Sequence, residues 1–140
     1  MRRRGLMEYP MSCENVEVIR SIYDDWLAGG TALDKFDPDI AIIESDTIPG
    51  APSAYGIEAV QRYMETFSDY WAEIRFEPQE FIEAGDRVVV VARLVGRGKK
   101  SGVEVARTWA YLWTVRAKRA LRMEAYADRA EALKAAGLAE

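Results

Sequence analysis

The pattern of apolar and polar positions predicts a helix near the start of the chain. Residues 13–28 carry apolar side chains at helical spacing. Ser12 supplies a start signal, and Gly29 supplies a stop. We expect residues 1–11 to be a loose tail, because Arg2–Arg4 precede no apolar stretch of the kind that makes a secretory signal.

The next segment alternates short elements with loops. A helical turn is expected at 31–36, a turn at 37–39 ("DPD") and a strand at 40–45. Residues 46–55 are rich in Pro, Gly and Ser, which predicts a loop. Residues 56–72 form an apolar stripe at helical spacing, so an amphipathic helix is expected there.

The second half of the chain predicts four strands joined by short turns, at 74–83, 88–96, 103–116 and 121–127. Pro78 interrupts the first of them and indicates an edge position or a bulge. Asp128 and Glu131 have the spacing of a capping box for a last helix at 129–136, which Gly137 ends. The order predicts one α+β domain over 12–140, with helices on one side of a curved antiparallel sheet.

Composition excludes several classes of function. The chain of 140 residues has a formal net charge of −4, which argues against nucleic acid as a partner. No apolar run is long enough to cross a membrane. The sequence has no histidine, which removes imidazole bases and imidazole metal sites, and no cofactor or metal is expected. Cys13 is the single cysteine, so no internal disulfide can form and a cytoplasmic location is expected.

Several segments resemble the SnoaL-like family, within the superfamily of nuclear transport factor 2 and ketosteroid isomerase. They are "SIYDDWLAGG", "FDPDIAIIESD", "YGIEAVQRYM", "EAGDRVVVVARLVGRGKKSG" and "DRAEALKAAGL". The resemblance implies a cone-shaped barrel, in which a bent sheet wraps around helices and leaves a deep apolar pocket. It also implies a homodimer through the outer face of the sheet. Because the superfamily hosts isomerases, cyclases, epoxide hydrolases, dehydratases and binding modules, the resemblance alone does not give the reaction.

Two acids follow the strand at 40–45 and are candidates for a catalytic base. The period of a strand gives Ile40, Ile42, Glu44 and Asp46 one common face. Similarity to the isomerases places Glu44 at the position of their general base. A carboxylate in an apolar cone has a raised pKa, which suits a base near neutral pH. The alternative is that Glu44 lies at the wet end of the strand or pairs with an arginine.

The same resemblance gives two positions for hydrogen-bond donors to a developing enolate. The donor on the first helix falls on Ile22, with Tyr23 next to it, and the donor on the long strand falls on Tyr111. A tyrosine hydroxyl can donate such a bond. It cannot replace the histidine that many SnoaL-like sequences carry at the position of Tyr111 as a proton shuttle, because its pKa is about 10.

The strand at 103–116 alternates between bulky and small side chains. Arg107, Trp109, Tyr111 and Trp113 share one face, and Ala106, Thr108, Ala110, Leu112 and Thr114 share the other. We expect the bulky face to line the cavity and the small face to form the dimer contact. The alternative exchanges these roles, with the aromatic residues at the dimer interface.

Arg93 interrupts the apolar strand at 88–96 and must find a partner if it is buried. Glu44, Asp46 or Glu124 could provide one, in a structural ion pair or in an acid–arginine–acid site. The epoxide hydrolases of the superfamily carry such a site with its arginine and one acid on the long strand, where this chain has Trp109 and Tyr111. Epoxide hydrolysis is therefore disfavoured.

Further aromatic residues are predicted to face the cone, beside Arg93, Trp109 and Trp113: Tyr23, Trp26, Tyr55, Tyr63, Trp71 and Tyr126. They would suit a flat apolar ligand. Two hypotheses follow. One is an isomerase- or cyclase-type enzyme that moves a proton α to a carbonyl, with Glu44 or Asp46 as base and Tyr111 as donor. The other is a binding or interaction module of the same fold that catalyses no reaction.

Overall fold

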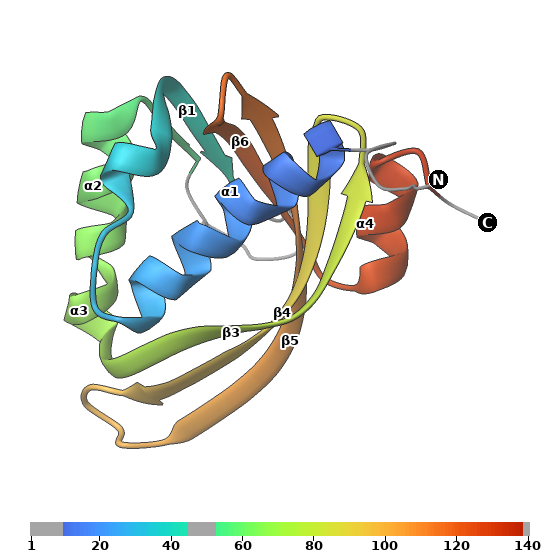
Figure 1. Ribbon diagram of the computed structural model, residues 1–140. Helices are drawn as coiled ribbons and strands as arrows, with labels where there is room; N and C mark the ends of the chain where they lie inside the picture. The colour runs from blue at the N-terminus through green and yellow to red at the C-terminus, as the bar shows by residue number, and fades with distance from the viewer. Residues whose placement is uncertain (1–9, 45–52, 139–140) are drawn as a thin grey trace.

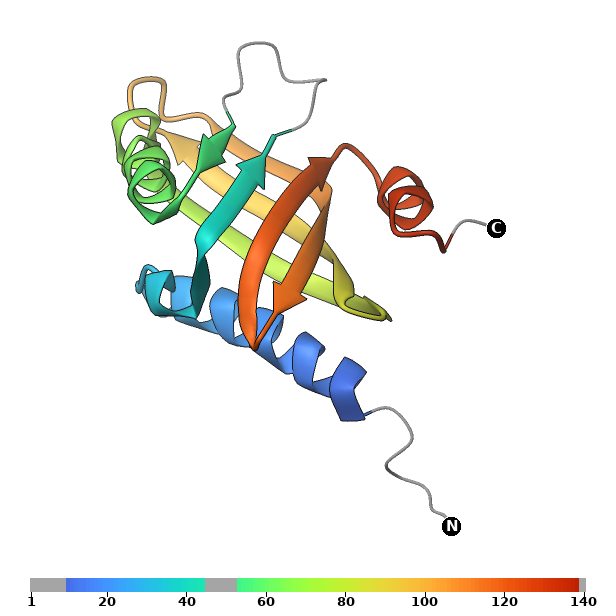
Figure 2. The same cartoon turned by 90° about the horizontal axis from the view of Figure 1, so that it is seen from above.

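The computed structural model describes residues 10–44 and 53–138, which form a curved sheet with helices on both of its faces (Figures 1 and 2). The elements follow the order α1 (Pro10–Leu27), η1 (Leu33–Lys35), β1 (Phe36–Ile43), β2 (Ala54–Tyr55), α2 (Ile57–Glu65), α3 (Phe67–Tyr70), β3 (Trp71–Ala84), β4 (Arg87–Gly98), β5 (Glu104–Arg116), β6 (Arg119–Tyr126) and α4 (Arg129–Ala135). The expected α+β class and the helix-filled cone are confirmed.

The sheet has six strands in the order β2-β1-β6-β5-β4-β3 and does not close into a barrel. Neighbouring strands are antiparallel except β1 and β6, which pair in parallel. The sheet is thus mixed rather than fully antiparallel. The long β3, β4 and β5 bend across the lower part of the molecule in Figure 1, so the sheet has a concave inner face and a convex outer face. Helices α1, α2 and α3 lie on the inner side.

The main core fills the space between α1 and the inner face of the sheet. Ile19 and Ile22 of α1 are fully buried, as are Val88 and Val90 of β4. Trp113 of β5 is also fully buried beside them. Burying a side chain of this size contributes roughly 1.5–3 kcal/mol. The amphipathic pattern of α1 therefore fixes how this helix lies on the sheet.

Helix α4 covers part of the outer face, which differs from the expectation that all helices lie on one side. Its Ala132 is fully buried against Val89, Ala110 and Leu112. Asp128 caps the helix by accepting a 2.8 Å hydrogen bond from the backbone N–H of Glu131, as the sequence predicted. The expected stop at Gly137 is also confirmed, with a φ of 80° there.

Several element boundaries differ from the sequence expectation. Helix α1 begins at Pro10, so Ser12 lies inside it and is not its cap. The segment at 37–39 belongs to β1 rather than to a turn, and Pro38 sits where the pairing of β1 with β6 shifts register. The predicted helix at 56–72 is two short helices, and Trp71 already belongs to β3. Pro78 lies at a register shift within the single strand β3, which is an edge strand, so the expected edge position and bulge are both confirmed.

Candidate functional site

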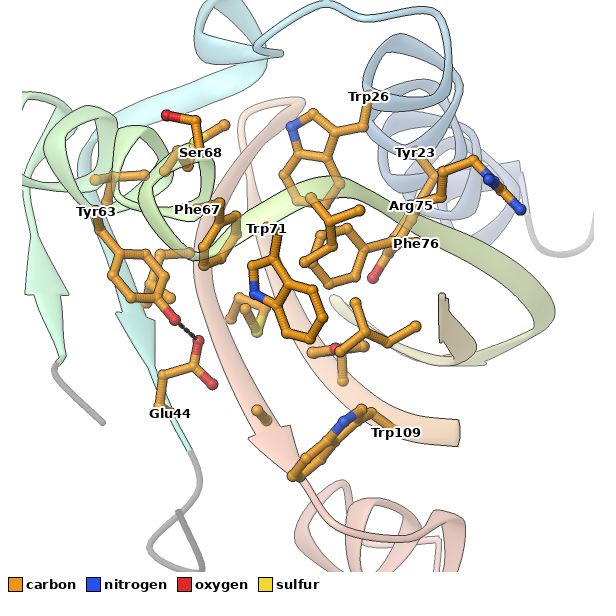
Figure 3. A pocket seen from close by; sticks show the side chains of 18 of the residues that line it. Tyr23, Trp26, Glu44, Tyr63, Phe67, Ser68, Trp71, Arg75, Phe76 and Trp109 are labelled. Carbon is orange, nitrogen blue, oxygen red and sulfur yellow. Dashed lines mark hydrogen bonds between the residues drawn. The ribbon is translucent and has the colours of Figure 1, made fainter. Parts of the chain in front are cut away.

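A cavity of about 610 Å³ lies between the inner face of the sheet and the three helices that cover it (Figure 3). Such a volume suits a small organic ligand. Its floor is β5 and β6, and its sides come from α1, α2 and the first residues of β3. The exposed lining residues, Gly30, Ser68, Ala72, Glu73 and Arg75, mark a mouth between the end of α1 and the α3–β3 junction. The remaining wall is mainly apolar and aromatic.

Glu44 stands just past the end of β1 and lines the cavity together with Ile42 of the same strand face. The side chain is half-buried, and burial raises the pKa of the carboxyl group. The hydroxyl of Tyr63, on α2, donates a hydrogen bond to this carboxylate, which acts in the opposite direction (Figure 3). The carboxylate is therefore held in place in an environment that makes it a stronger base.

Tyr111 lines the same cavity from the middle of β5. It is 7% exposed, and burial raises the pKa of its hydroxyl, with a further contribution from the charge of Glu44. The phenol is thus fixed in its protonated, hydrogen-bond-donating form at neutral pH. Within the described part of the chain its hydroxyl has no hydrogen-bond partner. The structure brings this donor and the Glu44 carboxylate into one chamber.

Tyr23 of α1 also lines the cavity, whereas Ile22 is buried in the core. Of these two neighbours, Tyr23 therefore faces the cavity, and Ile22, the position that the resemblance to the isomerases indicated, does not. Its hydroxyl oxygen accepts a 3.0 Å hydrogen bond from the indole N–H of Trp113. Burial holds the pKa of Tyr23 well above its usual range.

The bulky face of β5 is a wall of the cavity, as expected. Trp109, Tyr111 and Trp113 all line it, and Arg107 lies at the same face with its guanidinium carbon 4.2 Å from the Trp109 ring centre. Trp71 lies across Gly96 of the neighbouring strand, where a Cβ would come within 2.8 Å of the indole ring. Glycine at 96 is what allows the indole to lie flat on the sheet.

Three predicted pocket residues do not line the cavity. Tyr55 is 65% exposed on β2, and Arg93 is exposed on the outer face opposite Glu77 of β3 and Thr108 of β5. Tyr126 donates a 2.7 Å hydrogen bond to Glu124 and packs with the α4 cluster. The prediction that Arg93 faces the pocket was wrong. Strand β4 is buried on both faces only as far as Ala92, and Arg93 is the first exposed residue after it. Asp46 lies outside the described residues.

The cavity also contains residues that the sequence did not single out. Three of them are aromatic and come from different elements: Phe36 of β1, Phe67 of α3 and Phe76 of β3. Phe76 packs against Trp26, with the ring centres 5.7 Å apart, and edge-on against Tyr111 at 6.4 Å. The period-two pattern of β3, in which Ile74 and Phe76 share a face, could have found Phe76.

Two further findings bear on the kind of site. Residues 10–44 and 53–138 contain no cluster of three His, Cys, Asp or Glu side chains that could hold a metal ion. Among those same residues, no helix combines the length and the apolar character that a membrane span requires.

The curved sheet, its covering helices and the enclosed cavity define an α+β protein of the nuclear transport factor 2-like class. The family model of the SnoaL-like domain matches residues 23–123, and the chain belongs to this family. A search of curated proteins finds no significant match.

Solved structures with the same fold are similar along most of their length. A nuclear transport factor 2-like protein from Burkholderia xenovorans shares 26% identity, with a TM-score of 0.70 over 89% of this chain and 97% of that one. A protein of the same class and of unknown function from Burkholderia pseudomallei shares 23%, with a TM-score of 0.74 over 86% and 95%. The protein TerC, co-crystallised with polyporic acid, shares 24%, with a TM-score of 0.73 over 82% and 92%.

Proposed function

We propose that this protein binds a flat, apolar carbonyl compound in its cavity and transfers a proton at the carbon next to the carbonyl group. One observation carries the proposal: Glu44 and Tyr111 line one mainly apolar cavity, and they lie close enough for the charge of Glu44 to affect the pKa of Tyr111. A base and a hydrogen-bond donor that face one chamber are what enolisation requires.

In this reaction the Glu44 carboxylate removes the proton from the α-carbon. The electron pair of the broken C–H bond moves into the carbonyl group, and the Tyr111 hydroxyl stabilises the negative oxygen by donating a hydrogen bond. The protonated Glu44 then returns the proton to another carbon, which gives isomerisation. In a cyclase, the enolate carbon would instead form a bond to a second carbonyl carbon, whose oxygen would take that proton.

The surroundings of each group support its role. Burial raises the pKa of Glu44, which strengthens the base, and the hydrogen bond from Tyr63 acts in the opposite direction by favouring the ionised form. Burial also raises the pKa of Tyr111, so this hydroxyl keeps its proton. The mainly apolar lining of the cavity strengthens the electrostatic interactions at the enolate.

A binding protein that catalyses no reaction is the second candidate. One oxygen of Glu44 already accepts the hydrogen bond of Tyr63, and Tyr63 in turn packs edge-on against Phe67 at 5.2 Å. A carboxylate held in this way can serve to fix a ligand hydroxyl without removing a proton from carbon.

We also propose that the protein is cytoplasmic and dimerises through the part of the outer sheet face that α4 leaves open. Ala106, Thr108 and Arg93 are exposed there, whereas Ala110 and Leu112, expected at the dimer contact, are covered by α4 of the same chain. Arg93 and Glu77 lie opposite each other on neighbouring strands. A two-fold axis between two such surfaces would place Arg93 of each copy next to Glu77 of the other copy.

The test begins with thermal-shift screening against steroid, polyketide and phenolic libraries, with polyporic acid among the compounds. Ketone hits are then incubated in deuterated water, and exchange at the α-carbon is followed by NMR for the wild type, Glu44→Gln and Tyr111→Phe. We expect Glu44→Gln to retain binding and to slow exchange by at least 100-fold, the usual contribution of a general base. Wild-type exchange no faster than in buffer would favour the binding protein. Unchanged binding and exchange in both variants would overturn the site.

A further inference from the structure

The wall that β5 contributes to the cavity holds two hydrogen-bond donors without acceptors in the described part of the chain. They are the hydroxyl of Tyr111 and the indole N–H of Trp109. Tyr111 is 7% exposed and Trp109 is 6% exposed, so both side chains are buried apart from the parts that border the cavity. A buried donor that lacks an acceptor costs about 1–3 kcal/mol. Groups of this kind in a cavity are satisfied by what the cavity binds.

Three other donors of the aromatic wall already have acceptors. The indole N–H of Trp113 donates to Tyr23, and that of Trp26 donates to the backbone oxygen of Thr31 at 3.1 Å. Tyr63 donates to Glu44. The hydroxyl of Tyr23 and the indole N–H of Trp71 also have no acceptor among the described residues, but Tyr23 already accepts a hydrogen bond and Trp71 is only half-buried. The two donors on β5 differ because both are nearly buried and share one strand face.

The placement of the two donors limits the ligand that can meet both. Tyr111 and Trp109 are two residues apart on one strand, so their Cα atoms are separated by about 7 Å, and side chains on one face of a strand stand roughly parallel. Arg107 packs on the Trp109 ring and holds the indole against the cavity wall. Figure 3 shows the Trp109 ring at the base of the cavity.

We propose that the ligand carries two acceptor oxygens set apart on one flat ring system, one for the Tyr111 hydroxyl and one for the Trp109 indole N–H. para-Quinones and 1,4-diketones of a six-membered ring have this arrangement, because their two oxygens lie on opposite sides of the ring. A single carboxylate does not, because its two oxygens lie too close together to meet parallel donors that are two residues apart. The inference rests on the proposed cavity function and adds Trp109 as the residue that selects dicarbonyl over monocarbonyl ligands.

The test compares three ligands of similar size by calorimetry. The first, 2,3-dimethylnaphthalene, has no acceptor, and 1-tetralone has one. The third, 2,3-dimethyl-1,4-naphthoquinone, has two, and its methyl groups block addition of thiols. We expect the quinone to bind most tightly to the wild type. Trp109→Phe and Tyr111→Phe should each raise the Kd for the quinone. The rise should be roughly 3- to 10-fold larger than the rise in the Kd for the hydrocarbon, which is the effect of one hydrogen bond.

A second readout separates a hydrogen bond from a change of packing. The four indole N–H signals are assigned in a 15N-labelled sample, the Trp109 signal by its loss in Trp109→Phe. We expect this signal to move downfield with the quinone and not with the hydrocarbon. The signal of Trp26, which lines the same cavity with its N–H already bonded to Thr31, is the control.

Equal binding of the three ligands, or a quinone preference that survives in Trp109→Phe, would overturn this inference and leave the proton-transfer proposal standing. Lack of binding by the whole series would also overturn it. The proton-transfer proposal fails separately, when no ketone hit undergoes exchange that depends on Glu44.

Discussion

At the scale of single residues, Glu44 is the half-buried acid of the cavity, and its burial works against the charged form of its carboxyl group. Burial raises the pKa of its carboxyl group in the folded protein, whereas the unfolded chain keeps the ordinary value. As the pH rises, the unfolded state therefore loses this proton first, and the folded state loses stability between the ordinary pKa and the raised one. The contribution of Glu44 to stability is unfavourable above that window and absent below it.

Glu44→Gln should therefore raise the melting temperature at pH 7 and leave it unchanged near pH 3, because glutamine keeps an acceptor for Tyr63 and carries no charge. The measurement is the difference in melting temperature between variant and wild type from pH 3 to pH 8. Using the difference cancels the titration of other acids, such as Asp37, whose pKa is lowered by the backbone N–H of Asp39 and by Arg116. A variant less stable than the wild type at pH 7 would contradict the burial argument.

A second prediction concerns the buried pair of Tyr23 and Trp113. Tyr23→Phe removes the acceptor of the Trp113 indole N–H and leaves that donor buried, since Trp113 is fully buried. We expect a loss of about 1–3 kcal/mol in the free energy of unfolding. Urea denaturation followed by tryptophan fluorescence measures it. Tyr70→Phe, at a position that is 72% exposed, is the matched control and should change stability by less than about 0.5 kcal/mol.

The residue scale also shows what sequence reasoning can reach in a site. The alternation of β1 and β5 grouped Glu44 with Ile42, and Tyr111 with Trp109 and Trp113. The family resemblance then selected the cavity side for these faces, where the structure has them. The bond between Tyr63 and Glu44 could not be predicted, because the two residues belong to different elements whose approach depends on the whole fold. Arg93 was misplaced because its strand leaves the core partway along its length.

At the scale of elements, the long strands and the last helix followed from local patterns, whereas the segments around β1 did not. Residues 37–39 look like a turn by composition, yet they extend as a strand because β1 pairs with β6, about 80 residues later in the chain. Trp71 continues the helical stripe of α2 in sequence but starts β3, where it lies over Gly96. Long-range pairing decided both cases against local propensity.

Helix α4 provides the prediction at this scale. Ala132 is fully buried against Val89, Ala110 and Leu112, so Ala132→Leu must push α4 away from the sheet. We expect it to destabilise the protein by about 1–3 kcal/mol in urea denaturation. The control is Glu80→Gln, which weakens the ion pair with Arg129. The side chains of that pair are 44% and 53% exposed, so its loss should cost less than about 1 kcal/mol. A larger effect of Glu80→Gln would mean that the ion pair, rather than packing, holds α4.

At the scale of the whole molecule, α4 divides the outer face of the sheet into two parts. The part near Leu112 and Val89 is closed by the helix, and the part formed by the far ends of β3, β4 and β5 stays exposed. Every residue of β5 from Glu104 to Thr108 is exposed, and these residues pair with β4 alone, because the pairing with β6 begins at Ala110. A second copy of the chain would bury this open part.

The last prediction follows from this division. Ala106→Glu places a charge at the centre of the open part, and in a symmetric dimer it meets its own copy across the two-fold axis or lies buried without a partner. We expect the wild type to sediment as a dimer at micromolar concentration and Ala106→Glu to sediment as a monomer with an unchanged circular dichroism spectrum. Lys100→Glu, in the exposed turn between β4 and β5, introduces the same charge outside that surface and should leave the dimer intact. Because the cavity lies on the opposite face of the sheet, Ala106→Glu should also bind the same ligands as the wild type. A wild type that sediments as a monomer would rule out the dimer, and loss of binding together with loss of the dimer would mean that the inner face depends on the second copy.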